Sequence, residues 1–261
     1  MAKRSKDEDT SWQAGHEWYD SIVGEEGHYY HRHVIFPQLL PWMAARGTPK
    51  MVGDLACGQG ILERVLPPKV QYRGVDLSSG LLDQAQARCA HPARAIFTHG
   101  DVTQTTTLPA ASCDVVTVIL ALQNMAHPAG CFQEIARILR PEGRAYIVLN
   151  HPAFRIPTLS DWVWDAEKGR QARRIDRYLS PLKLPLKIHP SQGEESPVAW
   201  AYHLPLFQWI QLATQAGLSV TGCAEWCSDK KSEGGRAAAE DAARREFPLF
   251  LALELAHAAK P

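Results

Sequence analysis

Apolar and polar positions alternate along the chain in a way that predicts strands and helices in turn. Short apolar runs with the length of strands lie at 50–58, 70–78, 94–101, 113–122, 144–150, 218–226 and 247–256. Between them, apolar residues at helical spacing predict helices at 61–66, 79–90, 129–140 and 207–216. Strands that alternate with helices are joined by crossovers, which build a largely parallel sheet covered on both faces. Ligands of such sheets bind at the carboxyl ends of the strands, so we expect a site there.

Several segments depart from this alternation. Residues 16–47 predict a helical N-terminal cap, and residues 154–204, which carry Trp residues and several prolines, predict an inserted lid after the fifth strand. We therefore predict one domain over 16–261, preceded by a flexible tail at 1–15. The polar stretch 228–246 is interpreted as a surface connection that is partly helical, and no site is assigned to it.

Composition and charge narrow the function classes. Lys and Arg together number 28 and are balanced by 28 Asp and Glu, so the whole chain has no positive field to attract nucleic acid or an anionic membrane. The longest apolar stretch, 115–122, is too short to span a bilayer. The six cysteines lack the paired spacing of a zinc ribbon or a disulfide framework. These features predict a cytoplasmic protein with neither a metal site nor a membrane partner, and they make nucleic acid an improbable ligand.

A glycine-rich segment, "VGDLACGQG" at 52–60, follows the first predicted strand. Asp54 lies within this turn and would repel a pyrophosphate, whereas a ligand with an ammonium or sulfonium centre would tolerate it. Asp76 ends the second strand, where a carboxylate can accept both hydroxyls of a ribose. Asp101 ends the third strand and can accept from the exocyclic amine of adenine, next to the Val102 N–H. Together these residues predict a nucleoside without a phosphate.

The segments "VGDLACGQG", "GVDLS" and "HGDV", followed by "CDVVTVILALQN" and "LRPEGRAYIVLN", resemble the ordered motifs of class I S-adenosylmethionine-dependent methyltransferases of the small-molecule type. The resemblance covers about residues 50–150 well and implies S-adenosyl-L-methionine as cofactor. It also implies an α/β Rossmann-like fold: a doubly wound, mostly parallel seven-stranded sheet with an antiparallel last strand. Ala56 stands where the family usually has the first glycine of its turn. Alanine should be tolerated there if its backbone keeps a negative φ.

The resemblance assigns cofactor roles to positions at the strand ends and in the cap. Asp54 would lie near the ammonium group, Asp76 would bind the ribose, and Tyr19 of the "YD" segment would close over the cofactor. Plain core packing is the alternative for Leu77, Leu120 and Ala121. The full set of implied cofactor residues is Tyr19, Asp54, Ala56, Gly58, Gly60, Asp76, Leu77, Asp101, Val102, Leu120 and Ala121.

Catalytic candidates follow from the chemistry that the resemblance implies. Methyl transfer from a sulfonium is an in-line displacement that needs positioning in a dry pocket, and a base helps only when the acceptor must lose a proton. His151 follows the fifth strand and is our predicted general base. His28 and Tyr29 belong to the cluster "EEGHYYHRH" and predict a role in covering the substrate; histidines on the surface of a packing helix are the alternative.

The predicted acceptor is the oxygen or nitrogen of a small molecule held beneath the lid. The charged run at 170–177 predicts either a solvated helix face or a clamp for a carboxylate or phosphate. A methyltransferase acting on a protein or RNA and a non-catalytic S-adenosylmethionine-binding protein stay open. A nicotinamide-dependent reductase is disfavoured because the G-x-G-x-x-G order is missing, and the family's motif for amino groups of bases is also missing after the fourth strand. The oligomeric state has no signature in the sequence.

Overall fold

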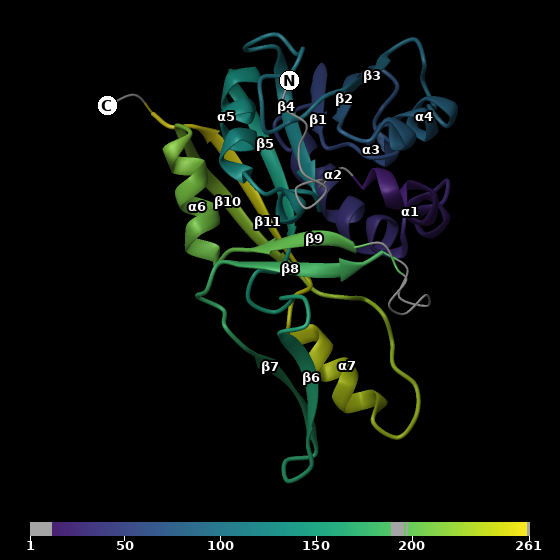
Figure 1. The fold of residues 1–261 in the computed structure, drawn as a ribbon, viewed down its shortest axis with the longest axis vertical. Helices are drawn as coiled ribbons and strands as arrows, with labels where there is room; N and C mark the ends of the chain where they lie inside the picture. The colour runs from purple at the N-terminus through teal and green to yellow at the C-terminus, as the bar shows by residue number, and fades with distance from the viewer. Residues whose placement is uncertain (1–11, 189–195, 197, 260–261) are drawn as a thin grey trace.

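The computed structural model describes residues 12–188, 196 and 198–259 (Figure 1). The predicted tail falls largely outside these residues, and its described end carries the short helix η2 (Gln13–Gly15). A central sheet with helices on both sides forms the main body, and two further hairpins extend from one end of it.

The central sheet has seven strands in the order β10-β11-β5-β4-β1-β2-β3. Neighbouring strands are parallel except for β11, which is antiparallel to both β5 and β10. This arrangement confirms the predicted doubly wound sheet with an antiparallel last strand. The strands are β1 (Met51–Leu55), β2 (Gln71–Asp76), β3 (Ala95–His99), β4 (Cys113–Ile119), β5 (Leu139–Asn150), β10 (Leu218–Trp226) and β11 (Phe250–His257).

Two apolar cores lie on opposite faces of this sheet. On one face, helices α5 and α6 bury Phe132, Ile135 and Trp209 against the strands. On the other face, the cap and α3 bury Ile35 and Leu62. Because the strands are covered on both sides, they read as continuous apolar runs rather than as alternating ones. The helices are α1 (His16–Val23), the π-helical turn η3 (His31–Ile35), α2 (Phe36–Ala44), α3 (Ile61–Val65), α4 (Ser79–Ala87), η4 (Leu122–Asn124), α5 (Pro128–Ile138), α6 (Leu206–Gln215) and α7 (Ala237–Glu246).

The segment after β5 forms two antiparallel hairpins, β6 (Ser160–Asp165) with β7 (Arg170–Ile175) and β8 (Leu182–Lys187) with β9 (Val198–His203). Figure 1 shows the β8–β9 hairpin at one end of the main sheet. The β6–β7 hairpin projects away from the main body and lies next to α7. The prediction that residues 170–177 form a helix is therefore wrong. Arg170, Arg173 and Arg174 lie on strand β7 and Arg177 follows it, because the aromatic and β-branched residues of β6 supply a pairing partner that helical spacing alone could not reveal.

The polar stretch before the last strand is partly helical, as predicted, since it contains α7. This helix packs against β7, and the Arg236 guanidinium lies over the Trp164 ring at 4.3 Å from its centroid. Within the described residues, no helix combines the length and the apolar character needed to cross a membrane.

Candidate active site

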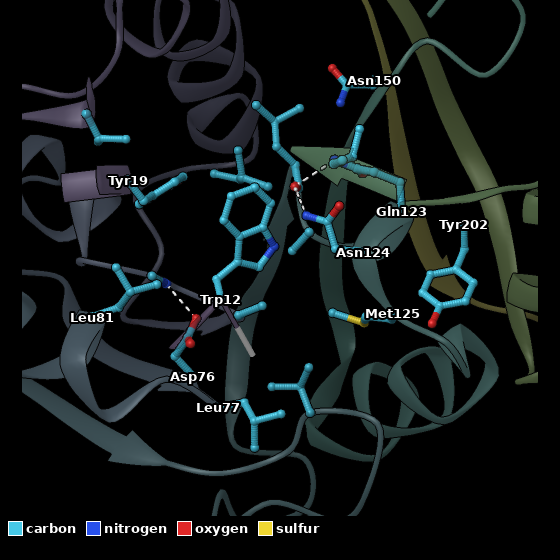
Figure 2. Close-up of a pocket in the computed structure, with 18 of the residues that line it drawn as sticks. Trp12, Tyr19, Asp76, Leu77, Leu81, Gln123, Asn124, Met125, Asn150 and Tyr202 are labelled. Carbon is cyan, nitrogen blue, oxygen red and sulfur yellow. Dashed lines mark hydrogen bonds between the residues drawn. The ribbon is translucent and has the colours of Figure 1, made fainter. Parts of the chain in front are cut away.

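A cavity of about 690 Å³ lies at the carboxyl ends of the central strands (Figure 2). Its floor is formed by residues that directly follow β1, β2, β3 and β4, which is the position expected for the ligand of such a sheet. The cap and the β8–β9 hairpin form its other walls. The predicted cofactor residues that line it are Tyr19, Ala56, Gly58, Asp76, Leu77, Asp101, Val102, Leu120 and Ala121.

Asp76 is the carboxylate best placed for a ligand with hydroxyl groups. It is buried, and its Oδ2 accepts a 2.8 Å hydrogen bond from the Gly58 N–H while its Oδ1 accepts one of 2.8 Å from the Ser78 N–H (Figure 2). Burial raises the pKa of Asp76, and these two N–H groups oppose that rise. Each oxygen keeps a further lone pair for a ligand hydroxyl, so the carboxylate fits the predicted ribose contact.

Asp101 is held at the cavity by the turn that follows it. Its Oδ1 accepts from the Thr103 N–H at 3.0 Å and from the Thr103 hydroxyl at 2.7 Å. Both Asp101 and the neighbouring Val102 line the cavity, together with Leu77 from the end of β2. These three positions therefore lie where the predicted adenine site requires them.

Asp54 does not lie where the ammonium contact was predicted. It is buried beneath the loop and does not line the cavity. Its Oδ2 accepts from the Tyr72 hydroxyl at 2.7 Å and its Oδ1 from the Thr117 hydroxyl at 2.7 Å. Burial raises its pKa to about 6, although both hydroxyls oppose the shift. The structure thus places Asp54 as an internal link between β1, β2 and β4 rather than in the cavity lining.

The glycine loop uses left-handed backbone at alternate positions. Ala56, Gly58 and Gly60 have φ of 57°, 54° and 71°. The condition set for tolerating alanine at position 56, a negative φ, is therefore not met, because the turn places three residues in this region whichever side chain they carry. Gly60 does not line the cavity; a Cβ there would come within 2.8 Å of Cε1 of Phe97, so it is a packing glycine.

Leu120, one of the implied cofactor residues, directly follows β4 and lines the cavity. Leu120 has a φ of 55°, and its carbonyl oxygen accepts from Gln123 Nε2 at 2.7 Å and from Asn124 Nδ2 at 3.4 Å (Figure 2). Gln123 lines the cavity, and its Oε1 is buried without a hydrogen-bond partner among the described residues. This oxygen is an acceptor that an ammonium group of a ligand can satisfy. The "LQN" sequence after the fourth strand is the signal that marks it.

Two aromatic side chains from the N-terminal region cover the same space. Tyr19 lines the cavity, and its Cε1 lies 3.9 Å from the point where a Cβ on Gly58 would be. Burial, together with the charge of Asp76, raises the pKa of Tyr19 to about 12. Figure 2 draws the indole of Trp12 in the middle of the lining residues, with its ring centroid 5.8 Å from that of Tyr19. Trp12 was missed because it belongs to the segment predicted as a tail.

The structure contradicts the predicted general-base role of His151. This side chain is buried and lies outside the cavity lining. Its Nε2 lies 2.7 Å from Oε1 of Glu225, and its Nδ1 accepts from the backbone N–H groups of Ala153 and Phe154 at 3.1 and 3.3 Å. Because both ring nitrogens are occupied, neither can take a proton from an acceptor. His151 instead secures the turn after β5.

Tyr29 also lies away from the cavity. Its ring stacks on His33 with centroids 4.3 Å apart, and its hydroxyl donates to Asp229 at 3.1 Å, so the predicted substrate contact is contradicted. His28 does line the cavity, as predicted, and so does His31, whose Nδ1 is buried without a partner among the described residues. Burial lowers the pKa of His28, and it lowers that of His31 to about 4. Both imidazoles are therefore neutral at neutral pH.

The wall opposite the cofactor residues comes from elements that are far apart in the sequence. Asn150 ends β5 and Arg155 follows it, Lys183 and Tyr202 lie on the β8–β9 hairpin, and Phe250 begins β11. Of these, the hairpin aromatic was expected from the insertion's composition, whereas Arg155 carried no signal. Residues 170–177, the charged run, do not line this cavity: Arg174 pairs with Asp161 at 2.9 Å on the exposed β6–β7 hairpin. Arg173 of the same run lines a second, adjoining cavity.

Comparison with known proteins agrees with this geometry. A family model described as a methyltransferase domain matches residues 53–147. An S-adenosylmethionine dependent methyltransferase from Mesorhizobium loti superposes with a TM-score of 0.62 at 25% identity, over 84% of this chain and 99% of that chain. The chain carries a class I methyltransferase domain. Its cofactor is S-adenosyl-L-methionine, and the Asp76 carboxylate and the unpartnered Gln123 oxygen fit that molecule's hydroxyl and ammonium groups.

Relatives of this methyltransferase domain have several substrates. A malonyl-[acyl-carrier protein] O-methyltransferase from Hahella chejuensis is 29% identical over 143 residues, which is 53% of this chain and 48% of that protein. A ubiquinone biosynthesis O-methyltransferase from Aromatoleum aromaticum is 25% identical over 138 residues, 51% of this chain and 57% of that protein. The chain thus spans about half the length of these curated relatives. The matches concern the methyltransferase domain and leave the acceptor open.

Proposed function

We propose that this protein transfers a methyl group from S-adenosyl-L-methionine to an oxygen or nitrogen atom of a small molecule. The observation that supports it is the single cavity that runs from Asp76 at the strand ends to Tyr202 on the β8–β9 hairpin. A cavity of this size has room for a cofactor and a small acceptor. The two named O-methyltransferases among the relatives favour oxygen as the methylated atom.

The cofactor, when bound, supplies an electrophilic methyl group on a sulfonium. An acceptor oxygen or nitrogen would take this methyl group in line with the sulfur, and neutral S-adenosylhomocysteine would be the other product. The chain's residues hold the two reactants in line and exclude water: Tyr19 and Trp12 cover the cofactor side, and the β8–β9 hairpin covers the acceptor side.

Proton removal, where an acceptor needs it, falls to the cap rather than to His151. His28 lines the cavity and is neutral at neutral pH, because burial and the nearby charges of Lys230, Arg155 and Arg32 lower its pKa. A neutral imidazole can accept a proton. We therefore assign His28 as the candidate base and expect it to matter only for acceptors that are not already ionised.

The test is transfer of tritium from S-adenosyl-[methyl-³H]methionine to two sets of acceptors: a panel of small phenols, carboxylic acids and amines, and the protein and RNA fractions of a cell lysate. The proposal expects label in the small-molecule set. Label only in the polymer fractions would overturn the small-molecule assignment. Tight cofactor binding by calorimetry without turnover on either set would favour the non-catalytic alternative.

A further inference from the structure

A second cavity of about 330 Å³ adjoins the first, and Arg155 lines both of them. The other shared lining residues are Gln123, Asn124, Asn150, Leu186 and Tyr202, so the two spaces meet between the segment after β4 and the wall that carries Arg155. Among the described residues that line the second cavity, two are arginines, Arg155 and Arg173, and none is an aspartate or a glutamate. The charges of the combined site are therefore separated: acids at the strand ends and cations at the far end.

The guanidinium of Arg155 lies against aromatic side chains of the cavity wall. Its Cζ is 5.7 Å from the centroid of the Phe250 ring. Burial lowers the pKa of Arg155, the charge of Arg173 lowers it further, and the Tyr30 phenol opposes the shift. The same positive charge contributes to lowering the pKa of His28, which also lines the first cavity.

Arg155 has no anionic partner in the part of the chain that the structure describes. Two other partly buried arginines there do: Arg88 pairs with Asp20 and Arg137 with Glu134. Arg173 is also engaged, because its Nε donates to the Phe154 carbonyl at 2.9 Å and its Nη2 to the Ser160 hydroxyl at 2.8 Å. A desolvated guanidinium without a counter-ion is unfavourable, and its fork of donors matches the two oxygens of a carboxylate or the oxygens of a phosphate.

We propose that the methyl acceptor is an organic anion whose carboxylate or phosphate group is bound by Arg155. Lys183, whose ammonium lies 4.2 Å from the centroid of the Trp200 ring, adds a second positive group to the same wall. With its anionic group at Arg155, the acceptor points its other end towards the strand ends, where the methyl group is delivered. Charge thus orients the acceptor, because the acids at the strand ends repel its anionic group.

This inference rests on the proposed function, so the test separates the two. Binding of S-adenosylhomocysteine is measured first by calorimetry; if it does not bind, the proposed function fails. The protein saturated with S-adenosylhomocysteine is then titrated with three probes of one shape: 4-hydroxyphenylacetate, 4-hydroxyphenyl phosphate and the uncharged 4-hydroxyphenylacetamide. We expect at least one anion to bind about tenfold or more tightly than the amide.

Variants identify the residue responsible. Arg155→Met should bring the anion and the amide to within about twofold of each other, whereas Arg155→Lys should keep part of the preference because it retains the charge without the fork. Arg174 is an exposed arginine on the β6–β7 hairpin, so Arg174→Met is the matched control. This variant should keep the full preference for the anion over the amide. Unchanged S-adenosylhomocysteine affinity shows that each variant is folded.

Three results would overturn the inference: no binding of any probe, equal binding of anion and amide by the unaltered protein, or an anion preference that survives Arg155→Met. A preference for the phosphate over the carboxylate, or the reverse, supports it and identifies which oxyanion the acceptor carries.

Discussion

The two ends of the cavity are built in different ways. The cofactor end consists of the residues that directly follow β1 to β4, and its contacts are mainly backbone groups and short side chains within one turn of a strand. The acceptor end is assembled from the cap, the turn after β5, the β8–β9 hairpin and the start of β11. The first is a local structure repeated at each strand end, and the second exists only where distant elements meet.

This difference explains why the cofactor end suits a ligand that many proteins share, whereas the other end suits an acceptor specific to this protein. Backbone turns at strand ends depend little on the identity of surrounding side chains, so the same cofactor site persists on many chains of this fold. By contrast, Arg155 and Tyr202 reach the cavity from segments that are not strands of the central sheet. We therefore expect substitutions at the cofactor end to change cofactor affinity, and substitutions at the acceptor end to change acceptor binding alone.

The largest effect is expected from Asp76→Ala. Removing hydrogen bonds from two ribose hydroxyls to a charged group should weaken S-adenosylmethionine binding by roughly a hundredfold, at about 1.5 kcal/mol or more for each bond. Calorimetry measures this directly. Asp83→Ala, at an exposed acid on α4, is the matched control and should bind normally. A hundredfold loss in the control, or none in Asp76→Ala, would break the comparison.

Asp54→Asn should separate folding from binding. The pKa of Asp54 is raised in the folded state from 3.8 to about 6. Its contribution to stability is therefore fully present below pH 3.8 and is lost as pH rises through about 6. Asparagine does not ionise, so the variant should gain about 2 to 3 kcal/mol relative to the unaltered protein across that window, in urea unfolding.

Cofactor affinity is the second measurement on Asp54→Asn. Because this side chain lies beneath the loop, we expect a change of less than about threefold in S-adenosylmethionine binding. A loss as large as that of Asp76→Ala would mean that Asp54 does reach the ammonium group, and it would restore the contact that the sequence suggested.

A smaller effect should distinguish the two hairpins. Tyr202→Ala removes an aromatic wall of the cavity and should weaken binding of 4-hydroxyphenylacetate by about fivefold, with S-adenosylhomocysteine affinity unchanged. Trp162→Ala truncates an aromatic residue of β6–β7, whose ring packs on Phe247 outside the cavity. That variant should bind the probe normally. Equal losses would show that the Trp162 ring, which lies 5.0 Å from the Arg173 guanidinium, also supports probe binding through the second cavity.

The smallest effect concerns the glycine loop. Ala56→Gly should raise the free energy of unfolding by about 0.5 kcal/mol, since glycine relieves left-handed strain but gives the unfolded chain more freedom. Ala111→Gly, at another left-handed alanine far from the cavity, should give a similar gain in thermal unfolding. A change in cofactor affinity above about twofold, in Ala56→Gly alone, would show that the alanine methyl itself contacts the ligand.

The order of strands and helices could be predicted because buried parallel strands need continuous apolar runs and their helices need one apolar face. The positions of Asp76 and Asp101 followed as well, since each ends such a run and the ends of parallel strands share one edge of the sheet. The position of each of these carboxylates at the cavity follows from its place at the end of a strand, which the local sequence pattern already indicates.

Other positions depended on contacts that no local pattern records. Asp54 lies one residue before the end of β1, opposite Gly74, whereas Asp76 is the last residue of β2. The hydroxyls of Tyr72 and Thr117 on the two neighbouring strands hold the Asp54 carboxylate inside the sheet. His151 directly follows β5, but its Nε2 is hydrogen-bonded to the Glu225 carboxylate on β10. Arg155 reaches the cavity because of how the turn after β5 packs against Phe250 on β11. Local sequence thus specifies the sheet and its cofactor edge, whereas the acceptor wall follows from long-range packing, because side chains from separate elements meet only once those elements are folded together.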